Sequence, residues 1–362
     1  MDLKTIEIFL KQFMKISIGT NIKDGPWGGG NLFAINLRNY LIKQGHNVVQ
    51  NLKDDDIDII LITEPRKTSE SSAYTHIEVL NYLSYVKSDT LVVHRFNECD
   101  ERKNTNYVNK YLINANKVAD HTIFVSNWLK QLYMNQGLNR ENLDVIYAGA
   151  DESIFNRNNL IRWDSIGPIK LVTHHWGANW NKGFDFYLFL DELIGKAEWK
   201  NKFEFTYIGN VPQKANFKNS SIIKPLSGAT LADEIKKNHI YITGSINEPS
   251  GNHHIEASQC GLPVLYINSG GIPEYCNNYG IMFDNKEDFV EKLLNLIENY
   301  SNYSKKLESY PFSASKMSMD YLNLFKHMYN NKEVYLKKRD LGYKKSFFGK
   351  KIFNYKRKKI NF

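Results

Sequence analysis

One stretch of the chain, residues 247–265, constrains the fold more than any other. It follows an apolar segment rich in β-formers at 239–243, and it predicts a loop, then a helix over 252–261, then a second strand over 264–267. The glycine at the expected end of the helix suits the left-handed position that follows many helices. Strands that alternate with helices in this way predict a parallel α/β sheet.

Two carboxylates occupy informative places in this stretch. Glu248 lies in the loop at the carboxyl end of the first strand, and Glu256 lies eight positions further on, inside the helix. In an open parallel sheet, ligands bind outside the carboxyl ends of the strands, where the next helix points its N-terminus. The free N–H groups near Gly251 and Asn252 therefore offer a place for phosphate, and Glu256 could accept hydrogen bonds from a vicinal diol such as a ribose. The alternative is that both glutamates are ordinary cap and surface charges.

The stretch resembles the paired-glutamate signature of retaining glycosyltransferases with the GT-B fold, especially glycosyltransferase family four. The matched residues are Glu248, Glu256-Ala257, Gly261-Leu262-Pro263-Val264 and Gly270-Gly271-Ile272-Pro273-Glu274. The resemblance implies that Glu256 holds the ribose of a nucleotide sugar and that Glu248 lies beside the transferred sugar. Gly270 and Gly271 would let the backbone approach this donor closely, because glycine has no Cβ.

The length of 362 residues predicts two domains of about 150 residues each. The resemblance covers about residues 14–330 and places the boundaries. We expect an N-terminal Rossmann-like domain on the acceptor side, a C-terminal Rossmann-like domain that binds the nucleotide sugar, a helix that crosses back to the first domain, and a basic aromatic tail. These are residues 1–160, 161–312, 313–330 and 331–362, and residues 1–13 are expected to be only an appended helix.

Composition narrows the cellular setting. Three scattered cysteines are too few for a disulfide framework, which favours a reducing cytoplasm. No apolar run approaches the length of a membrane span, and charged residues interrupt the N-terminus where a signal peptide would need apolar ones.

The first βα turn is rich in glycine. A strand over 15–19 is followed by the loop 24–31 and a helix that is expected to end near Gln44. The loop is not the dinucleotide fingerprint, because Phe33 stands where a third glycine is required, so a dehydrogenase is disfavoured. On the resemblance, Gly28 and Gly29 face the cleft and close on the donor's phosphates or the acceptor. The alternative is a loop that is tight only for packing.

An acidic run at 54–58 suggests the Asp-x-Asp metal site of the other large glycosyltransferase fold. These acids precede the strand 57–62, whereas ligand sites follow strands. We therefore interpret the run as a solvated turn, and no metal or other cofactor is expected.

A strand over 90–93 is expected to deliver ionisable residues to its carboxyl end. His94 is similar to a histidine that touches the donor sugar in family-four enzymes, and the alternative is a histidine that caps the strand. Asp100, Glu101 and Arg102 could meet the acceptor or pair with one another.

In the second domain, Lys182 lies in a Lys-Gly-Phe-Asp segment that resembles the family's diphosphate-binding loop. The family's arginine five residues earlier is missing, because Gly177 stands there. Candidates to replace that cation are His174, His175 and the indole N–H of Trp176 or Trp180. Two further positions, Asn210 after the strand 203–208 and Leu226 near the base, complete the expected donor site.

The net charge of +8 belongs to the C-terminal tail. Residues 331–362 hold twelve lysines and arginines, two acids and interspersed aromatic residues, while the rest of the chain is nearly neutral. This pattern favours peripheral attachment to an anionic membrane surface at the inner face. The alternative is a solvated tail, and contact with nucleic acid is not expected, because the body carries no recognition module.

The sequence therefore predicts a retaining, hexosyltransferase-type enzyme of the GT-B fold. It would transfer a sugar from a nucleotide sugar to a glycan or lipid-linked glycan in the synthesis of surface polysaccharide or glycoconjugate. The alternatives are another GT-B enzyme, such as a nucleotide-sugar epimerase, and a non-enzymatic protein that binds nucleic acid or sugar.

Overall fold

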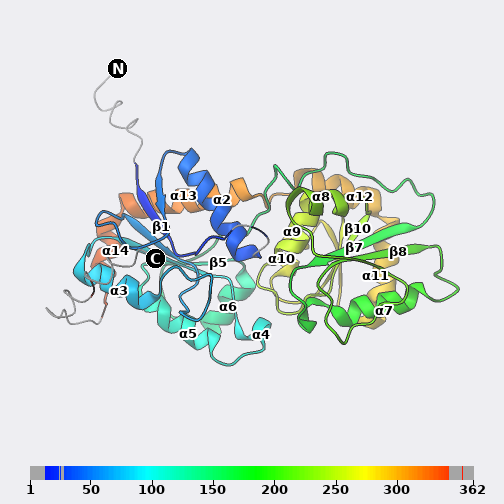
Figure 1. The fold of residues 1–362 in the computed structure, drawn as a ribbon, viewed down its shortest axis with the longest axis horizontal. Helices are drawn as coiled ribbons and strands as arrows, with labels where there is room; N and C mark the ends of the chain where they lie inside the picture. The colour runs from blue at the N-terminus through cyan, green and yellow to red at the C-terminus, as the bar shows by residue number, and fades with distance from the viewer. Residues whose placement is uncertain (1–12, 24, 26–27, 342–352, 354–362) are drawn as a thin grey trace, which may run out of the picture.

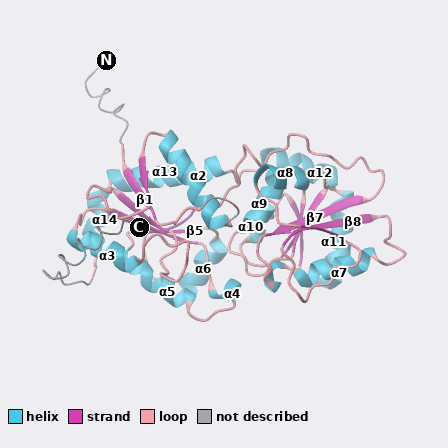
Figure 2. Cartoon of the chain, viewed as in Figure 1, coloured by secondary structure: helices cyan, strands magenta, loops and turns pink. Residues whose placement is uncertain are grey.

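The computed structural model describes residues 13–23, 25, 28–341 and 353. The chain forms two α/β domains that lie side by side (Figure 1). Each domain contains a six-stranded, all-parallel sheet with helices packed on both faces (Figure 2). The strand orders are β2-β1-β3-β4-β5-β6 and β12-β11-β10-β7-β8-β9. The two parallel α/β domains that the sequence predicts are confirmed.

The elements of the first domain alternate along the chain as strand and helix. They are β1 Lys15–Ile18, α2 Gly29–Lys43, β2 Asn47–Val49, β3 Ile59–Ile62, α3 His76–Tyr85, β4 Leu91–Phe96, α4 Asp100–Lys103, α5 Val108–Ala115, β5 His121–Phe124, α6 Asn127–Asn135 and β6 Leu143–Val145.

The second domain repeats this alternation and is followed by two helices that belong to the first domain's side. Its elements are β7 Ile169–His175, α7 Phe184–Ile194, β8 Phe203–Gly209, β9 Ser221–Ile223, α8 Gly228–Ile235, β10 Ile240–Thr243, α9 Asn252–Gln259, β11 Val264–Ile267, α10 Ile272–Cys276, β12 Gly280–Phe283, α11 Lys286–Glu298 and α12 Tyr300–Lys306. The last helices are α13 Ala314–Asn330 and α14 Lys332–Lys338.

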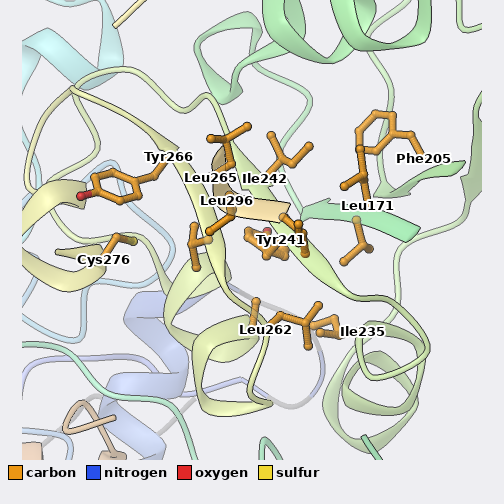
Figure 3. Close-up of a cluster of buried hydrophobic side chains, with 14 of the residues drawn as sticks. Leu171, Phe205, Ile235, Tyr241, Ile242, Leu262, Leu265, Tyr266, Cys276 and Leu296 are labelled. Carbon is orange, nitrogen blue, oxygen red and sulfur yellow. The ribbon is translucent and has the colours of Figure 1, made fainter. Parts of the chain in front are cut away.

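The cores explain why the central strands are apolar throughout. All four residues of β3 and all four of β10 are buried, as expected for strands with helices on both faces. In the second domain, Leu171 of β7 and Tyr241 of β10 pack near Ile235 of α8 (Figure 3). The sheet is thus a fixed platform, and its loops can position side chains at the carboxyl ends of the strands.

The chain passes between the domains twice, and the two crossings are bonded to each other. Ala150 forms an isolated parallel bridge with Ser313, in which the Ala314 N–H donates to the Ala150 carbonyl at 2.7 Å. Gly149 allows this approach, because a Cβ there would lie 2.7 Å from the Ala314 nitrogen. After the second crossing, α13 packs along α2 (Figure 1), with the rings of Tyr321 and Phe33 5.2 Å apart. This helix therefore lies against the first domain.

The ordered chain continues beyond the predicted start of the tail. α14 lies within residues 331–362, and its Tyr335 is buried in the first domain's core. Arg339 then donates to the carboxylate of Asp120, with an Nε–Oδ1 distance of 2.8 Å, and to the carbonyls of Ser88 and Thr90. The boundary predicted at residue 331 was wrong, because α14 buries apolar surface that periodicity in a basic segment did not reveal. No helix of the described residues is long and apolar enough to cross a membrane.

The Arg339 anchor should contribute much of the stability at the C-terminal end. Its side chain is 8% exposed and that of Asp120 is 2% exposed, so Arg339→Ala leaves a buried carboxylate without its cation. We expect a loss of roughly 3–5 kcal/mol in the free energy of unfolding, measured by urea denaturation. Lys338→Ala is the matched control, because its pair with Glu141 is exposed and should contribute about 0–1 kcal/mol. Equal effects of the two variants would refute the anchoring role.

Candidate active site

The strand–loop–helix–strand segment forms as predicted at β10, α9 and β11. Gly261 adopts the left-handed conformation with φ of 94°, as expected beyond the end of the helix. Gly251 precedes the first residue of α9 with φ of 79°, so the turn that exposes the N-terminal N–H groups of α9 needs a glycine. The two predicted carboxylates then lie on either side of this turn.

Glu248 lies at the boundary between the domains and is only 6% exposed. Its Oε2 accepts from Lys182 Nζ at 2.6 Å, and its Oε1 accepts from Arg102 Nε at 2.9 Å. Lys182 belongs to the second domain and Arg102 belongs to α4 of the first. One buried carboxylate therefore joins cations from both domains.

This arrangement fixes the charge of the site. Although burial opposes ionisation of Glu248, Arg102 and Lys182 hold the pKa of its carboxyl well below the usual range. The attraction of Glu248 raises the pKa of Arg102, while burial lowers that of Lys182 and Glu248 opposes this lowering. Glu248 is thus a permanent anion at neutral pH and cannot serve as a general acid. It can stabilise positive charge that develops nearby.

Glu256 is buried inside α9 and contacts the end of β7. Its Oε2 lies 2.8 Å from Nε2 of His174, and the His174 ring also contacts Tyr241. His174 therefore supports Glu256. His175, the next residue of β7, has a different partner. Its Nε2 lies 2.7 Å from the Tyr187 hydroxyl. Among the described residues, no three His, Cys, Asp or Glu side chains are grouped so that they could hold a metal ion.

Glycines allow the two domains to approach at this place. A Cβ on Gly29, at the start of α2, would lie 2.9 Å from Oδ1 of Asn252 at the start of α9. Gly28 precedes α2 with φ of 79°. Gly271 would bring a Cβ within 2.7 Å of the Ser126 hydroxyl. The start of α2 thus lies against the start of α9.

The turn after β11 supports both the site and the interface. The Gly271 N–H donates to the Glu248 carbonyl at 2.8 Å, and Gly270 has φ of 64° where a Cβ would strike the Glu248 backbone. Further along, the Glu274 carboxylate accepts from the N–H groups of Asn127 and Trp128, at 2.8 and 2.7 Å. Glu274 therefore caps α6 of the other domain.

His94 is not placed as the sequence predicts. β4 continues to Phe96, so His94 lies inside the strand and not after it. The side chain is fully buried, its Nδ1 lies 3.2 Å from the Asn116 amide, and burial lowers its pKa to about 3. The prediction that the strand delivers His94 to the cleft was wrong, because two further residues, Arg95 and Phe96, pack well enough to extend it.

The three residues predicted on the acceptor side have different surroundings. Asp100 accepts from the N–H groups of Tyr107, Val108 and Asn109 and so organises its own loop. Glu101 accepts from the side-chain amides of Asn109 and Gln136. Only Arg102 reaches Glu248.

The remaining predicted donor residues lie around the second sheet. Asn210 follows β8 and donates to the Trp176 carbonyl at 2.7 Å, and Leu226 is half-buried against the core. Of the four suggested replacements for a cation at Gly177, His174 and His175 are engaged as described above. The Trp180 indole donates to Asp185 at 2.9 Å, and Trp176 is half exposed.

Sequence reasoning missed several residues that build the site. Glu98 accepts from Nη1 of Arg102 at 3.0 Å and also contacts Lys103 at 3.1 Å. Asn181 and Asn247 donate across the interface to the carbonyls of Arg102 and Glu101, at 3.4 and 3.3 Å. The only sequence signal for the two asparagines was their place beside Lys182 and Glu248, because contacts between residues this distant in sequence leave no local pattern.

Part of the second domain matches a known protein family. Residues 194–311 match the family model for Glycosyl transferases group 1. A probable sucrose-phosphate synthase from Thermosipho melanesiensis is 27% identical over 205 residues, which cover 51% of this chain and 45% of that protein. The gpi3 subunit of a phosphatidylinositol N-acetylglucosaminyltransferase from Schizosaccharomyces pombe is 30% identical over 87 residues, or 24% of this chain and 19% of the relative. The chain thus spans less than half the length of these curated relatives.

Solved structures match over most of the chain. HepE from Anabaena, in complex with UDP and glucose, aligns with a TM-score of 0.63 and 13% identity over 87% of this chain and all of the other. Sucrose-phosphate synthase from Thermosynechococcus elongatus aligns with a TM-score of 0.58 and 13% identity over 88% of this chain and all of the other. The chain therefore has the GT-B fold, and part of its second domain matches the glycosyl transferases group 1 family.

Proposed function

We propose that the protein is a retaining glycosyltransferase that moves a sugar from a nucleotide-sugar donor to a glycan or lipid-linked glycan. The observation that carries the proposal is the buried Glu248, which meets Lys182 and Arg102 eight residues before the buried Glu256. The group 1 match lies over this same domain, and the HepE complexes hold UDP with glucose or UDP-glucose. Surface polysaccharide or glycoconjugate synthesis is the setting that we infer for such an acceptor.

The residues suit a front-side displacement on the sugar. Glu256 would accept hydrogen bonds from the ribose, and the N–H groups at the start of α9 would face the diphosphate. Lys182 would stabilise the negative charge that develops on the leaving diphosphate. Glu248 stays ionised and would stabilise an oxocarbenium-like sugar on the opposite side of the breaking bond. None of these steps calls on a metal.

The proposal is tested by incubating the protein with a panel of nucleotide sugars and measuring release of nucleoside diphosphate with and without glycan acceptors. Acceptor-dependent release is expected. Release of diphosphate that is independent of any acceptor, with an isomerised sugar as the product, would point instead to a nucleotide-sugar epimerase.

Glu256→Gln should weaken binding of the matching nucleoside diphosphate about tenfold, because a charge-assisted bond to the ribose becomes a neutral one. The amide keeps the shape of the side chain and an acceptor for His174, so the fold should persist. Titration calorimetry measures the affinity, and Glu291→Gln on the exposed face of α11 is the control. Unchanged affinity would exclude the ribose role.

Glu248→Gln should lower the turnover number at least tenfold while affinity for the free diphosphate stays equal or rises. The reason is that Lys182 and Arg102 lose a competing carboxylate, whereas the transferred sugar loses its anion. Steady-state kinetics and calorimetry on the same preparation separate the two effects. A parallel loss of turnover and diphosphate affinity would show that Glu248 binds the nucleotide or is structural.

We also propose that the basic C-terminal segment attaches the protein to an anionic membrane surface. Residues 342–362, apart from Phe353, lie outside the described residues, and the segment carries eight lysines and arginines without an acid. A basic residue close to an anionic leaflet contributes about 1 kcal/mol. Attachment would bring a lipid-linked acceptor within reach.

Replacing Lys356, Arg357, Lys358 and Lys359 together by glutamine should sharply reduce co-sedimentation with vesicles that contain phosphatidylserine. Transfer to a soluble acceptor should stay unchanged, because Phe353, which packs against Tyr85, is retained. Rising salt should release the unmodified protein in the same way. Equal vesicle binding by the two proteins would rule out this segment as the anchor.

A further inference from the structure

The segment around α4 reaches across the cleft to the loops that hold the candidate active site. Besides the Arg102–Glu248 contact, the carbonyls of Glu101 and Arg102 accept from Asn247 and Asn181 of the second domain. These asparagines are the chain neighbours of Glu248 and Lys182. The first domain therefore docks on the same two loops that carry the anion and the cation of the site.

Contacts within the first domain hold the Arg102 side chain in position. The Asp100 carboxylate ties α4 to the start of α5, and Asn104 ends α4 in the left-handed conformation with φ of 54°. Glu98 then holds Nη1 of Arg102 through both carboxylate oxygens, at 3.0 and 3.2 Å. Arg102 is thus held by residues of its own domain, in addition to its contact with Glu248.

Arg102 keeps donors for a further partner. Nε contacts Glu248 and Nη1 contacts Glu98, while Nη2 has no acceptor among the described residues. The side chain of Arg102 is 26% exposed, and that of Lys182 is 14% exposed.

The second domain alone brings one ammonium or guanidinium to Glu248 among the described residues, that of Lys182. A diphosphate carries more negative charge than one lysine neutralises, and the planar guanidinium is well suited to bind two phosphate oxygens at once. Arg102 is the neighbouring cation, and its Nη2 keeps two N–H donors without an acceptor among the described residues. The start of α9 lies at the same boundary, where Gly29 approaches Asn252 closely and the N–H groups of α9 begin.

We propose that Arg102 of the first domain and Lys182 of the second form a cation pair for the diphosphate of the donor. The inference rests on the proposed function and goes beyond it in one respect: tight binding of the diphosphate requires the closed arrangement of the two domains. Arg102 thus serves the donor and not the acceptor. The free energy of phosphate binding is then coupled to closure, because only closure brings the second cation.

The test compares Arg102→Gln with Lys103→Gln, a matched control. Lys103 lies on the same helix and contacts Glu98, but it does not contact Glu248. Calorimetry with UDP, GDP and ADP first identifies the diphosphate that the unmodified protein binds, and the corresponding monophosphate is then titrated. Arg102→Gln should weaken the diphosphate at least tenfold and the monophosphate less than threefold, while Lys103→Gln should retain both affinities. Arg102→Lys should recover part of the loss.

Closure provides a second readout. Small-angle scattering should show a smaller radius of gyration on addition of the diphosphate to the unmodified protein and to Lys103→Gln, but not to Arg102→Gln at the same concentration.

The outcomes separate the inference from the proposed function. If the unmodified protein binds none of the nucleotides, the proposed function fails and the inference fails with it. If it binds a diphosphate and Arg102→Gln binds it equally well, only the inference is overturned. Normal diphosphate affinity with reduced turnover would mean that Arg102 merely positions Glu248.

Discussion

The interaction on which the site depends is the shared carboxylate of Glu248. Burying an anion costs several kcal/mol unless cations and hydrogen bonds compensate it, and here the compensation comes from two domains. Each domain alone leaves the group incompletely neutralised, because Arg102 and Lys182 are separated by 80 positions in sequence and belong to different sheets. The closed arrangement is thus built into the electrostatics of the site.

Small residues and polar caps make this approach sterically feasible. Gly29 and Gly271 remove side chains where Asn252 and Ser126 come close, and Glu274 satisfies N–H groups at the start of α6 that would otherwise lie unpaired at the interface. The interface at these positions is therefore polar. Such an interface is compatible with opening and closing around a substrate.

Local patterns in the sequence predicted the scaffold well. The breaks at Pro249 and Gly251 and the left-handed Gly261 delimited α9, so the positions of Glu248 and Glu256 relative to the helix followed directly. The pattern failed where burial overrides propensity. Arg95 did not suggest a strand interior, yet it stacks on Phe33 with 3.9 Å between guanidinium carbon and ring centre, and β4 continues past His94.

The sequence did not predict which side chains contact one another in the folded protein. The partners of Glu248 could be suggested only as groups in the right kind of loop. Asn181 and Asn247 gave no signal, because their roles arise from contacts across the cleft. For the same reason, α14 was not predicted. It lies in a basic segment, and its Tyr335 is buried in the core of the first domain, far from it in sequence.

The bonded crossings at Ala150 and Ser313 have a mechanical consequence. Two separate linkers would let the domains twist and slide, but two crossing segments that are joined by hydrogen bonds bend together. Motion between the domains is then confined mainly to a hinge rotation about a single axis. The Glu248 site lies at the boundary between the domains, so a change of a few degrees in the backbone near Gly149 would move the two halves of the cleft relative to each other.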